Sequence, residues 1–316
     1  VAELDVATSE NNIQESIAQV YIQILYAAES VKVNESTLQV SIAQRDRGQE
    51  LLNAGSIAKS DFAQLEAQVS TDRYQLVTAQ ATLEDYKLQL KQLLELDGEN
   101  EMNIYLPALS DENVLAPLPT KKDVYIRALS LRPEIEASKL NVEASELGIG
   151  IAKSSYLPTI SLSAGIGTNH TSGSDFTFGE QVKNGWNNSI GLSVSVPIFN
   201  NRQTKSAVQK AKLQYETSML SLLDEQKTLY KTIEGLWLDA NSAQQRYAAA
   251  NEKLKSTQIS YELISEQFNL GMKNTIELLT EKNNLLQAQQ EQLQAKYMAI
   301  LNMQLLKFYQ GDQLAI

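Results

Sequence analysis

Apolar side chains recur every three or four residues along most of the chain, which is the spacing of one face of an α-helix. The first run extends from Val1 to about Leu52 without a proline, and a second run follows Gly55. Two sets of residues in the second run keep a seven-residue register: Phe62, Val69, Leu76, Leu83 and Leu90, and Leu65, Ala79, Tyr86 and Leu93. The pattern predicts a first helical hairpin over residues 1–96, with long antiparallel helices and a coiled-coil seam.

Turn-forming residues interrupt the helical spacing after this hairpin. The run Asp97-Gly98-Glu99-Asn100 is expected to end the second helix. Three prolines follow in a polar setting: Pro107, Pro117 and Pro119. Residues 97–130 are therefore expected to form an irregular connection. A helix over residues 131–157 is expected next, with Pro133 in its first turn, where a helix tolerates proline.

The spacing changes from helical to alternating after Pro158. Apolar residues then alternate with Ser, Gly or Pro in two runs: Ile160, Leu162, Ala164 and Ile166, and Ile190, Leu192, Val194, Val196 and Ile198. We expect a β-hairpin over residues 158–199 around a polar loop from Thr168 to Asn187. Each strand is close to the ~9–11 residues that cross a bilayer at barrel tilt, and aromatic residues of the girdle type stand at the strand ends: Tyr156, Trp186 and Phe199. From these two strands alone, a soluble hairpin packed on helices is an equal alternative.

The last part of the chain, residues 200–310, predicts a second helical hairpin that repeats the first. Its turn falls at Asn269-Leu270-Gly271, and its last helix has a heptad of Leu279, Leu286, Leu293 and Ile300. A shift of 216 residues superposes Gly55 on Gly271 and Asp61 on Glu277 without gaps, which indicates a duplicated helix–turn–helix unit. The second copy is preceded by a β-hairpin that the first copy lacks. We therefore expect the natural chain to carry roughly 90 or more further N-terminal residues, with a second hairpin and a signal peptide.

The charge balance and the residue inventory narrow the possible functions. With 27 Lys and Arg against 38 Asp and Glu, the net charge of −11 disfavours nucleic acid as a partner. Cysteine is absent and His170 is the one histidine, which excludes thiolate chemistry, Cys/His zinc sites and nearly all Ser-His-Asp catalysis and leaves only an all-carboxylate metal site open. No other constellation of acid, base and nucleophile is recognisable. We therefore expect no enzyme and no cofactor.

Three local patterns are more specific than the periodicity. One is Leu131-Arg132-Pro133-Glu134-Ile135-Glu136-Ala137, followed by Ala152-Lys153-Ser154-Ser155-Tyr156-Leu157-Pro158. The others are Val196-Pro197-Ile198-Phe199 and, in both repeats, a turn glycine with an acidic residue six positions later. In these patterns the sequence resembles the TolC family of outer-membrane efflux proteins, the exit ducts of tripartite pumps and type I secretion systems in Gram-negative bacteria. The resemblance covers essentially the whole chain, which lacks the family's first hairpin and the helix before it.

The resemblance implies a fold, a function and partners. In the family, a homotrimer builds a β-barrel in the outer membrane and a long α-helical barrel across the periplasm. The chain would then be mainly α, with one β-hairpin contributing to the outer-membrane barrel. Its function would be that of an exit duct for efflux or secretion, a passive conduit gated at its periplasmic end. The implied partners are a periplasmic adaptor (membrane fusion) protein, an inner-membrane pump and outer-membrane lipid.

The resemblance also assigns roles to residues near the second turn. Glu277 matches an acidic position at the closed periplasmic aperture, and Thr280 matches a second such position. Asp61 and Lys273 match a polar link that holds the aperture closed. Phe268 stands where the family can use a tyrosine hydroxyl, so that link is missing.

Two further sets of residues follow from the resemblance. The turn tips at Gly55 and Gly271 are the expected contacts with the adaptor. The residues expected to meet the membrane are Ile160, Leu162, Ile166, Ile190, Leu192, Val194, Val196 and Trp186.

Each of these roles has a plain structural alternative. Asn274-x-x-Glu277 has the form of a capping box. Capping the helix explains Glu277 as well as the aperture role does. For Asp61, the slightly favoured explanation is a first-turn acid that compensates the helix dipole, beside a solvated Lys273. For the whole chain, the alternative to a duct is a non-conducting periplasmic adaptor or a structural coiled coil.

Overall fold

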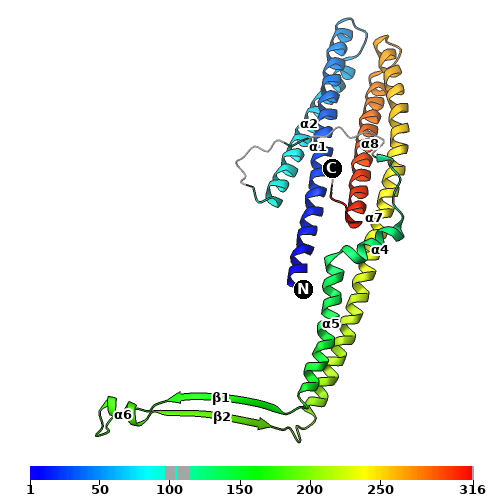
Figure 1. The fold of residues 1–316 in the computed structure, drawn as a ribbon. Coiled ribbons are helices and arrows are strands. Elements are labelled where there is room, and N and C mark those ends of the chain that lie inside the picture. The colour runs from blue at the N-terminus through cyan, green and yellow to red at the C-terminus, as the bar shows by residue number, and fades with distance from the viewer. Residues whose placement is uncertain (97–103, 106–113, 315–316) are drawn as a thin grey trace. The chain divides into compact units, whose positions relative to one another are not determined.

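The computed structural model describes residues 1–96, 104–105 and 114–314 of the chain. The described part is mainly α-helical and includes a two-stranded sheet. Its elements run in this order (Figure 1): α1 (Ala2–Asn53), α2 (Lys59–Leu93), α4 (Lys121–Leu131), α5 (Pro133–Ser154), β1 (Thr159–Gly167), α6 (Phe178–Asn184), β2 (Asn187–Ser195), α7 (Gln203–Asn269) and α8 (Thr275–Tyr309). Within these ranges no helix combines the length and the apolarity that a membrane crossing requires. The Asp97–Asn100 run and Pro107 lie outside the described residues.

The chain divides into two compact units. The helical unit comprises Ala2–Glu136 and Glu225–Ile316, and the hairpin unit comprises Ala137–Asp224 together with Val1. In the hairpin unit, α5 and the first part of α7 are joined by a hydrogen bond between the hydroxyls of Ser145 and Ser218, 2.8 Å apart. Both units therefore contain long helices, and the hairpin unit also holds the sheet.

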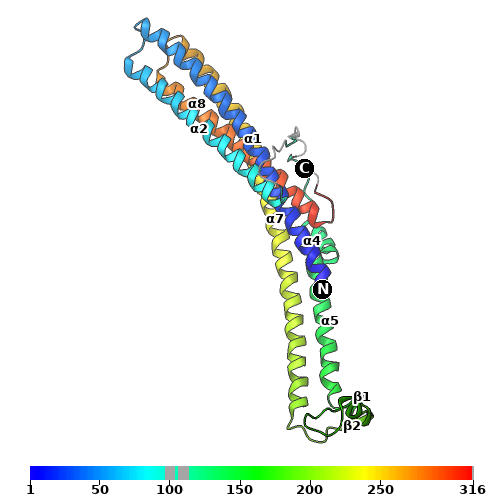
Figure 2. The same ribbon diagram turned by 90° about the vertical axis from the view of Figure 1, so that its left-hand side faces the viewer.

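The helical unit contains α1, α2 and α8 and the part of α7 from Glu225 onward, which belong to the two predicted helical hairpins. α1 and α2 lie side by side, and α8 packs against both of them (Figures 1 and 2). The predicted helix ends are confirmed closely, because α1 ends at Asn53 and α8 ends at Tyr309. Pro133 is the first residue of α5, as expected for proline at a helix start. At ~1.5 Å per residue, the 52 residues of α1 span about 78 Å.

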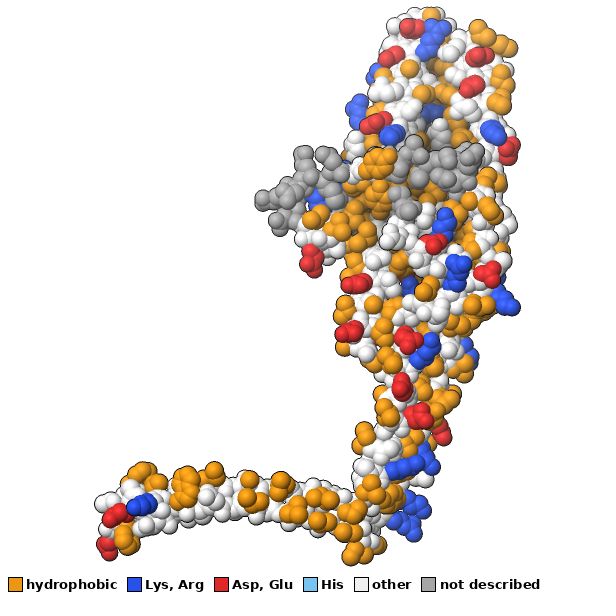
Figure 3. Space-filling model, viewed as in Figure 1, with side chains coloured by type: hydrophobic (Ala, Val, Ile, Leu, Met, Phe, Trp, Pro, Cys, Tyr) orange, Lys and Arg blue, Asp and Glu red, His pale blue; other side chains and the backbone are white. Residues whose placement is uncertain are grey.

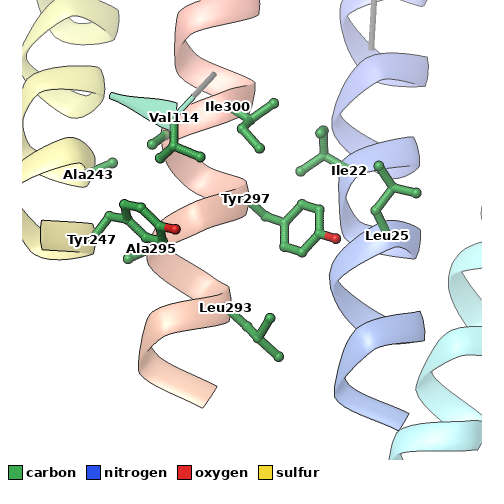
Figure 4. Packing of buried hydrophobic residues seen from close by; sticks show 10 residues of the cluster. Ile22, Leu25, Val114, Ala243, Tyr247, Leu293, Ala295, Tyr297 and Ile300 are labelled. Carbon is green, nitrogen blue, oxygen red and sulfur yellow. The ribbon is translucent and has the colours of Figure 1, made fainter. Parts of the chain in front are cut away.

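Three apolar clusters line the length of α8. The first joins α1, α7 and α8, and Figure 4 shows Tyr297 of α8 pointing toward Ile22 and Leu25 of α1, with Tyr247 of α7 on the other side. Tyr26 meets the Tyr297 ring edge to face, with the ring centroids 6.4 Å apart. The second cluster joins α4, α5, α7 and α8 around Val124, Ile135, Ile233 and Leu306. The third, named here the tip cluster, consists of Leu65, Phe268 and Leu278 with Leu51, Tyr261, Ile264 and Leu279 packed against it.

Two predictions about irregular segments were wrong. α4 begins within the segment 97–130 that was expected to be irregular and ends one residue beyond it, because Thr120 caps a helix there by accepting a hydrogen bond from the Asp123 N–H at 3.3 Å. α6 lies inside the polar loop expected from Thr168 to Asn187. There Thr177 and Glu180 form a reciprocal capping box, which starts a short helix within an otherwise polar sequence.

The predicted β-hairpin is present, with β1 and β2 paired antiparallel. Ile160 lies opposite Val194 and Leu162 opposite Leu192, so the apolar side chains share one face and Ser and Gly share the other. Figure 3 shows hydrophobic side chains along the length of the hairpin. β2 ends at Ser195, short of the predicted Ile198, because Pro197 has no N–H to donate to a strand ladder.

The turns at the two hairpin tips have the same backbone geometry. In each turn the glycine N–H donates to the carbonyl three residues earlier at 2.9 Å, and the next N–H donates to the carbonyl five residues earlier at 2.8 Å. Gly55 and Gly271 have φ angles of 72° and 74°, which favour glycine, so both turns are Schellman motifs. The glycines that superpose in the sequence repeat therefore also have the same backbone conformation and hydrogen bonds in the structure.

The helices that leave these turns begin differently. Asn274 Oδ1 accepts from the Glu277 N–H at 2.9 Å, and Glu277 Oε2 accepts from the Asn274 N–H at 3.2 Å, which confirms the predicted capping box. Ala58 holds the equivalent position before α2 and has no polar side chain. Only the returning bond is made there, from the Ala58 N–H to Asp61 Oδ2 at 3.3 Å.

Substitution Asn274→Ala is expected to destabilise the start of α8 by about 1 kcal/mol, because one cap hydrogen bond is lost. Amide hydrogen exchange in the full-length protein would then be about fivefold faster at Glu277. Ala58→Asn should slow exchange at Asp61, because it supplies the missing half of a box. Asn283→Ala, at an exposed position within α8, is the control. Equal exchange at Glu277 in the Asn274 and Asn283 variants would contradict the assigned cap.

Candidate aperture site at the hairpin tips

Glu277 is held at the start of α8 by three hydrogen bonds. Besides the two bonds of the capping box, its Oε1 accepts from Lys273 Nζ at 2.5 Å. The hydrogen bonds from Lys273 and from the Asn274 backbone hold the pKa of Glu277 below its ordinary value. The carboxylate is solvent-exposed at 39%. It is therefore a fixed, ionised group at the tip of the second helical hairpin.

Asp61 and Lys273 are not brought together within the described residues of one chain. Lys273 forms an ion pair with Glu277, four residues later in the same helical hairpin. The Asp61 carboxylate accepts a hydrogen bond from the Ala58 N–H in the other helical hairpin. Thr280 is one turn beyond Glu277 on α8, and its hydroxyl donates to the Ile276 carbonyl at 2.7 Å. The Asp61–Lys273 link of the aperture thus stays a prediction.

The second turn exposes large apolar side chains around Gly271. Leu270, Met272 and Ile276 are exposed at 75%, 70% and 62%. Neither Gly55 nor Gly271 has a neighbour within 4 Å of a Cβ built on it. The tips are therefore open to a partner, and the second tip has an apolar surface that nothing in the described chain covers.

The residues expected to meet the membrane are exposed on the hairpin. Their exposed fractions range from 58% for Trp186 to 84% for Ile190. The paired register places the strand members of this set on one face, whereas Trp186 precedes β2 and Val196 follows it. This face is apolar except at Asn188, which lies opposite Ile166, and the other face consists mainly of Ser and Gly.

The first local pattern of the sequence forms a buried junction in the helical unit. Arg132 ends α4, and its Nε donates to Glu134 Oε1 at 2.7 Å while Nη2 donates to Glu15 Oε1 of α1 at 3.3 Å. The guanidinium carbon lies 4.3 Å from the centroid of the Tyr309 ring at the end of α8. Burial raises the pKa of Glu15, and Arg132 opposes that shift. The pattern therefore connects the start of α5 to α1 and α8.

A buried polar cluster between the two helical hairpins was missed in the sequence. Lys282 of α8 donates to Asp72 of α2 and to the Ser41 hydroxyl of α1, and Ser41 also donates to Asp72. Gln68 Nε2 completes the cluster by donating to Asp72 Oδ1 at 2.9 Å. Lys282 and Asp72 are only 3% and 1% exposed. We name Ser41, Gln68, Asp72 and Lys282 the buried ion cluster.

Burial and pairing shift the pKa of Lys282 in opposite directions. Desolvation lowers the pKa of Lys282, and the Asp72 carboxylate opposes the shift. Removing one partner of such a pair leaves an uncompensated buried charge, which typically costs about 3–5 kcal/mol. The cluster thus connects α1, α2 and α8 through a buried ion pair in which each charge stabilises the other.

A signal for this cluster was present in the heptads. Asp72 occupies the seam position between Leu65 and Ala79, where the seven-residue register calls for an apolar side chain. Lys282 stands three residues after Leu279 and four before Leu286, also on the seam side of its helix. Opposite charges at seam positions of two helices predict a buried pair, provided that the two helices are known to be neighbours.

Residues 124–311 match the family model described as outer membrane efflux protein. The chain is 24% identical over 290 residues to the outer membrane efflux protein BepC of Brucella suis, covering 91% of this chain and 60% of BepC. It is 23% identical over 304 residues to the outer membrane protein TolC of Escherichia coli, covering 93% of this chain and 60% of TolC. The chain thus spans about 60% of the length of these curated relatives.

The fold is also similar to a solved structure. CusC, whose crystal structures concern folding and transmembrane channel formation, superposes with a TM-score of 0.84 at 18% identity. The similarity covers 98% of this chain and 71% of the CusC chain. At this identity the likeness concerns the arrangement of helices and strands.

Substitution Lys282→Met is expected to lower the free energy of unfolding by about 3–5 kcal/mol, because Asp72 stays buried without its counter-charge. The double variant Lys282→Met with Asp72→Leu should recover most of that loss. Chemical denaturation of the full-length protein, followed by circular dichroism, measures both. Lys255→Met is the control, because Lys255 pairs with Glu252 in solvent at 3.0 Å and should cost only about 0–1 kcal/mol. A loss in the Lys282 variant no larger than in this control would show that the buried pair is not needed.

Proposed function

The chain belongs to the outer membrane efflux protein family, and on this premise we propose that it is part of a trimeric exit duct, a passive conduit gated at its periplasmic end. The family consists of channel proteins rather than enzymes and lies in the outer membrane of Gram-negative bacteria. Because the chain spans about 60% of its curated relatives, the activity of the whole protein is part of the proposal. The duct would serve an efflux pump or a type I secretion system.

The β-hairpin is the observation that carries the proposal. Its two strands have nine residues each, one apolar face and one face of Ser and Gly. Strands of ~9–11 residues with apolar side chains toward lipid and polar ones toward an interior are the pattern of a transmembrane strand. In the proposed homotrimer, hairpins from neighbouring copies cover the strand edges, and lipid covers the apolar face.

The helical unit supports the conduit part of the proposal. Its helices are long, and apolar side chains remain exposed along them, for example Tyr74 and Leu88 of α2 and Leu238 and Ile259 of α7. A helix with apolar side chains on more than one face must pack against other helices on each of those faces to keep them from water. Neighbouring copies in a helical barrel would supply those partners and leave the polar faces toward water.

The gate is proposed at the tip of the second helical hairpin. One copy places the ionised Glu277 carboxylate there, with Thr280 one turn farther along the same helix. Repeated around a threefold axis, Glu277 would give the aperture a negative potential that favours cations. Asp61 and Lys273 are proposed to hold the aperture closed, as exposed groups whose contribution depends on the threefold repetition.

The tips are also the proposed site of adaptor contact. The apolar side chains of Leu270, Met272 and Ile276 surround Gly271 and are exposed in the chain. Contiguous exposed apolar residues on a protein surface indicate an interaction site. The adaptor would link the duct to an inner-membrane pump, which supplies the energy that a passive conduit lacks.

Single-channel conductance of the full-length protein in a planar bilayer tests the duct and its gate. Glu277→Ala is expected to raise the small resting conductance and to weaken cation preference, because the charge at the constriction is removed. Asp61→Ala with Lys273→Ala should also raise the conductance. The control is Glu252→Ala, which removes an exposed, lysine-paired carboxylate from the shaft of α7 and should leave both quantities unchanged. Absence of conductance from well-folded protein would instead favour a non-conducting adaptor or a structural coiled coil.

Cross-linking to the adaptor tests the contact at the tips. Leu270→Ser with Met272→Ser is expected to reduce the cross-linked yield severalfold, because the apolar contact area is lost. Gly271→Asn should largely preserve it, since asparagine tolerates the left-handed backbone of a Schellman turn. Glu252→Ser, at an exposed polar position on the shaft of α7, is the control. Unaltered cross-linking in the double variant would show that the tip does not contact the adaptor.

A further inference from the structure

Five positively charged residues lie where α5 and α7 meet the β-hairpin. Lys153 is in the last turn of α5, and the others stand just before α7 and in its first three turns: Arg202, Lys205, Lys210 and Lys212. We name these five residues the basic cluster. We infer that the basic cluster binds the headgroups of anionic phospholipids in the membrane leaflet on the helix side of the hairpin. This inference rests on the proposed function, because it requires the hairpin to cross the bilayer.

The basic cluster differs in charge from the rest of the chain. The net charge of the whole chain is −11, yet no Asp or Glu lies between Glu146 and Asp175 or between Glu180 and Glu216. Figure 3 shows Lys and Arg side chains gathered at the end of the helices that adjoins the hairpin. The acids Asp175 and Glu180 stand with Lys183 at the other end of the hairpin, around α6. The hairpin therefore has a cationic end toward the helices and an end with excess acid away from them.

The charges of the basic cluster are available to a partner. All five residues are exposed, and none of them forms an ion pair within the described ranges of the chain. Other exposed lysines do form such pairs, as Lys255 does with Glu252. The start of α7 adds the positive end of a helix dipole, and no acid in the first turn compensates it. An anion from outside the chain would stabilise this concentration of positive charge.

The backbone at Arg202 is a second, independent observation. Asn201 and Arg202 have φ angles of 48° and 62°, in the left-handed region that is uncommon for a side chain as large as arginine. The turn is held by a hydrogen bond from the Gln203 N–H to the Asn200 carbonyl at 2.9 Å and by the Asn200 amide, which donates to the Thr204 hydroxyl. A large residue kept in such a conformation indicates that its side chain is used. Here it places a guanidinium between the end of β2 and the start of α7.

The order of side chains along the chain matches the layers of a bilayer surface. Exposed apolar residues border the strands on the helix side, with Tyr156 and Leu157 before β1 and Ile198 and Phe199 after β2. The cations come next, on the side away from the strands. Aromatic side chains at the level of the headgroups, with Lys and Arg beside them, are the pattern of a membrane interface.

Every member of the basic cluster is near enough to the strands to reach the headgroups. Lys212 is the farthest along α7, nine residues beyond Gln203, which is at most about 14 Å along the helix. The headgroup layer is ~5–8 Å thick on each side of a bilayer, and charges act over a further ~8 Å at physiological ionic strength. The two lengths together are similar to the extent of the cluster.

Phosphate is the chemical group that such cations recognise, and both a lipid and free phosphate could supply it. Arginine binds phosphate through two parallel hydrogen bonds, and lysine binds it as a point charge. We assign the cluster to lipid because its members are spread over the ends of two helices and adjoin an apolar surface of membrane length. Clusters of Lys and Arg next to a membrane segment attract anionic lipids in this way.

Lipid selectivity of the full-length protein in phosphatidylcholine vesicles tests the inference. Spin-labelled phosphatidylglycerol and phosphatidylcholine report how strongly each lipid is held at the protein surface. The protein is expected to prefer phosphatidylglycerol about threefold at low salt. The preference should vanish in about 1 M NaCl, where the Debye length is ~3 Å. Replacing all five residues of the basic cluster by Gln should abolish the preference at low salt as well.

The matched control replaces five exposed cations of the helical unit by Gln and changes the net charge by the same amount: Lys32, Arg73, Lys122, Lys227 and Lys231. It should keep the preference for phosphatidylglycerol. An equal preference in the cluster variant and the unsubstituted protein would overturn the inference. So would a changed ion selectivity of the channel with unchanged lipid preference, because the cations would then face the lumen.

Inorganic phosphate distinguishes the two sources of the anion. Adding it at constant ionic strength, in exchange for chloride, is expected to leave the preference for phosphatidylglycerol unchanged. Loss of the preference would show that the cluster takes a free anion and would overturn the assignment to lipid.

Quenching of Trp186 by brominated lipids tests the premise separately. The chain has two tryptophans, so Trp237→Phe leaves Trp186, at the far end of the hairpin, as the reporter. Quenching is expected if the hairpin lies in the bilayer. Quenching without a preference for phosphatidylglycerol would overturn the inference and leave the proposed function standing. Absence of quenching would count against both.

Discussion

The helical unit depends on the burial of α8. A single long helix with an apolar stripe is marginal in water, and most of its stability comes from what covers that stripe. α8 contributes to all three apolar clusters, with Leu278 near one end, Ile300 in the middle and Leu306 near the other. The helices that cover it are α1 and α2 from the beginning of the chain, α4 from its middle, and α7, which precedes it. Contacts between residues far apart in sequence therefore determine where the other helices lie.

The pattern that makes the sequence resemble its family is structural rather than functional. Arg132 lies between two carboxylates and an aromatic ring, at the point where one helix ends and Pro133 begins the next. An arginine there provides five donors in a rigid fork and stacks on a ring, which lysine would not do. The residue identities of the pattern thus follow from the packing of a helix junction against α1 and α8.

Local signals explain how much of the fold could be predicted from the sequence. The long helices, their glycine turns and the two strands follow from periodicity and from a few residues such as Gly271 and Asn274, whose effects reach only a few positions. α4 and α6 were missed because the caps at Thr120 and Thr177 lie in stretches that look like loops. The buried ion cluster was missed for a different reason. Asp72 and Lys282 are 210 residues apart, and their pairing depends on which helices are neighbours.

The exposed hairpin has a consequence for the order of assembly. A two-stranded hairpin in water is marginally stable by itself, and a strand edge with apolar side chains readily pairs with other chains. β1 and β2 meet no other strand in the described chain, whereas the helical unit buries its own clusters. The helices can therefore fold before the strands have their final neighbours. The hairpin then depends on encounter with other copies or lipid, so biogenesis of the protein should be sensitive to its concentration and to holding factors that shield the strands until insertion.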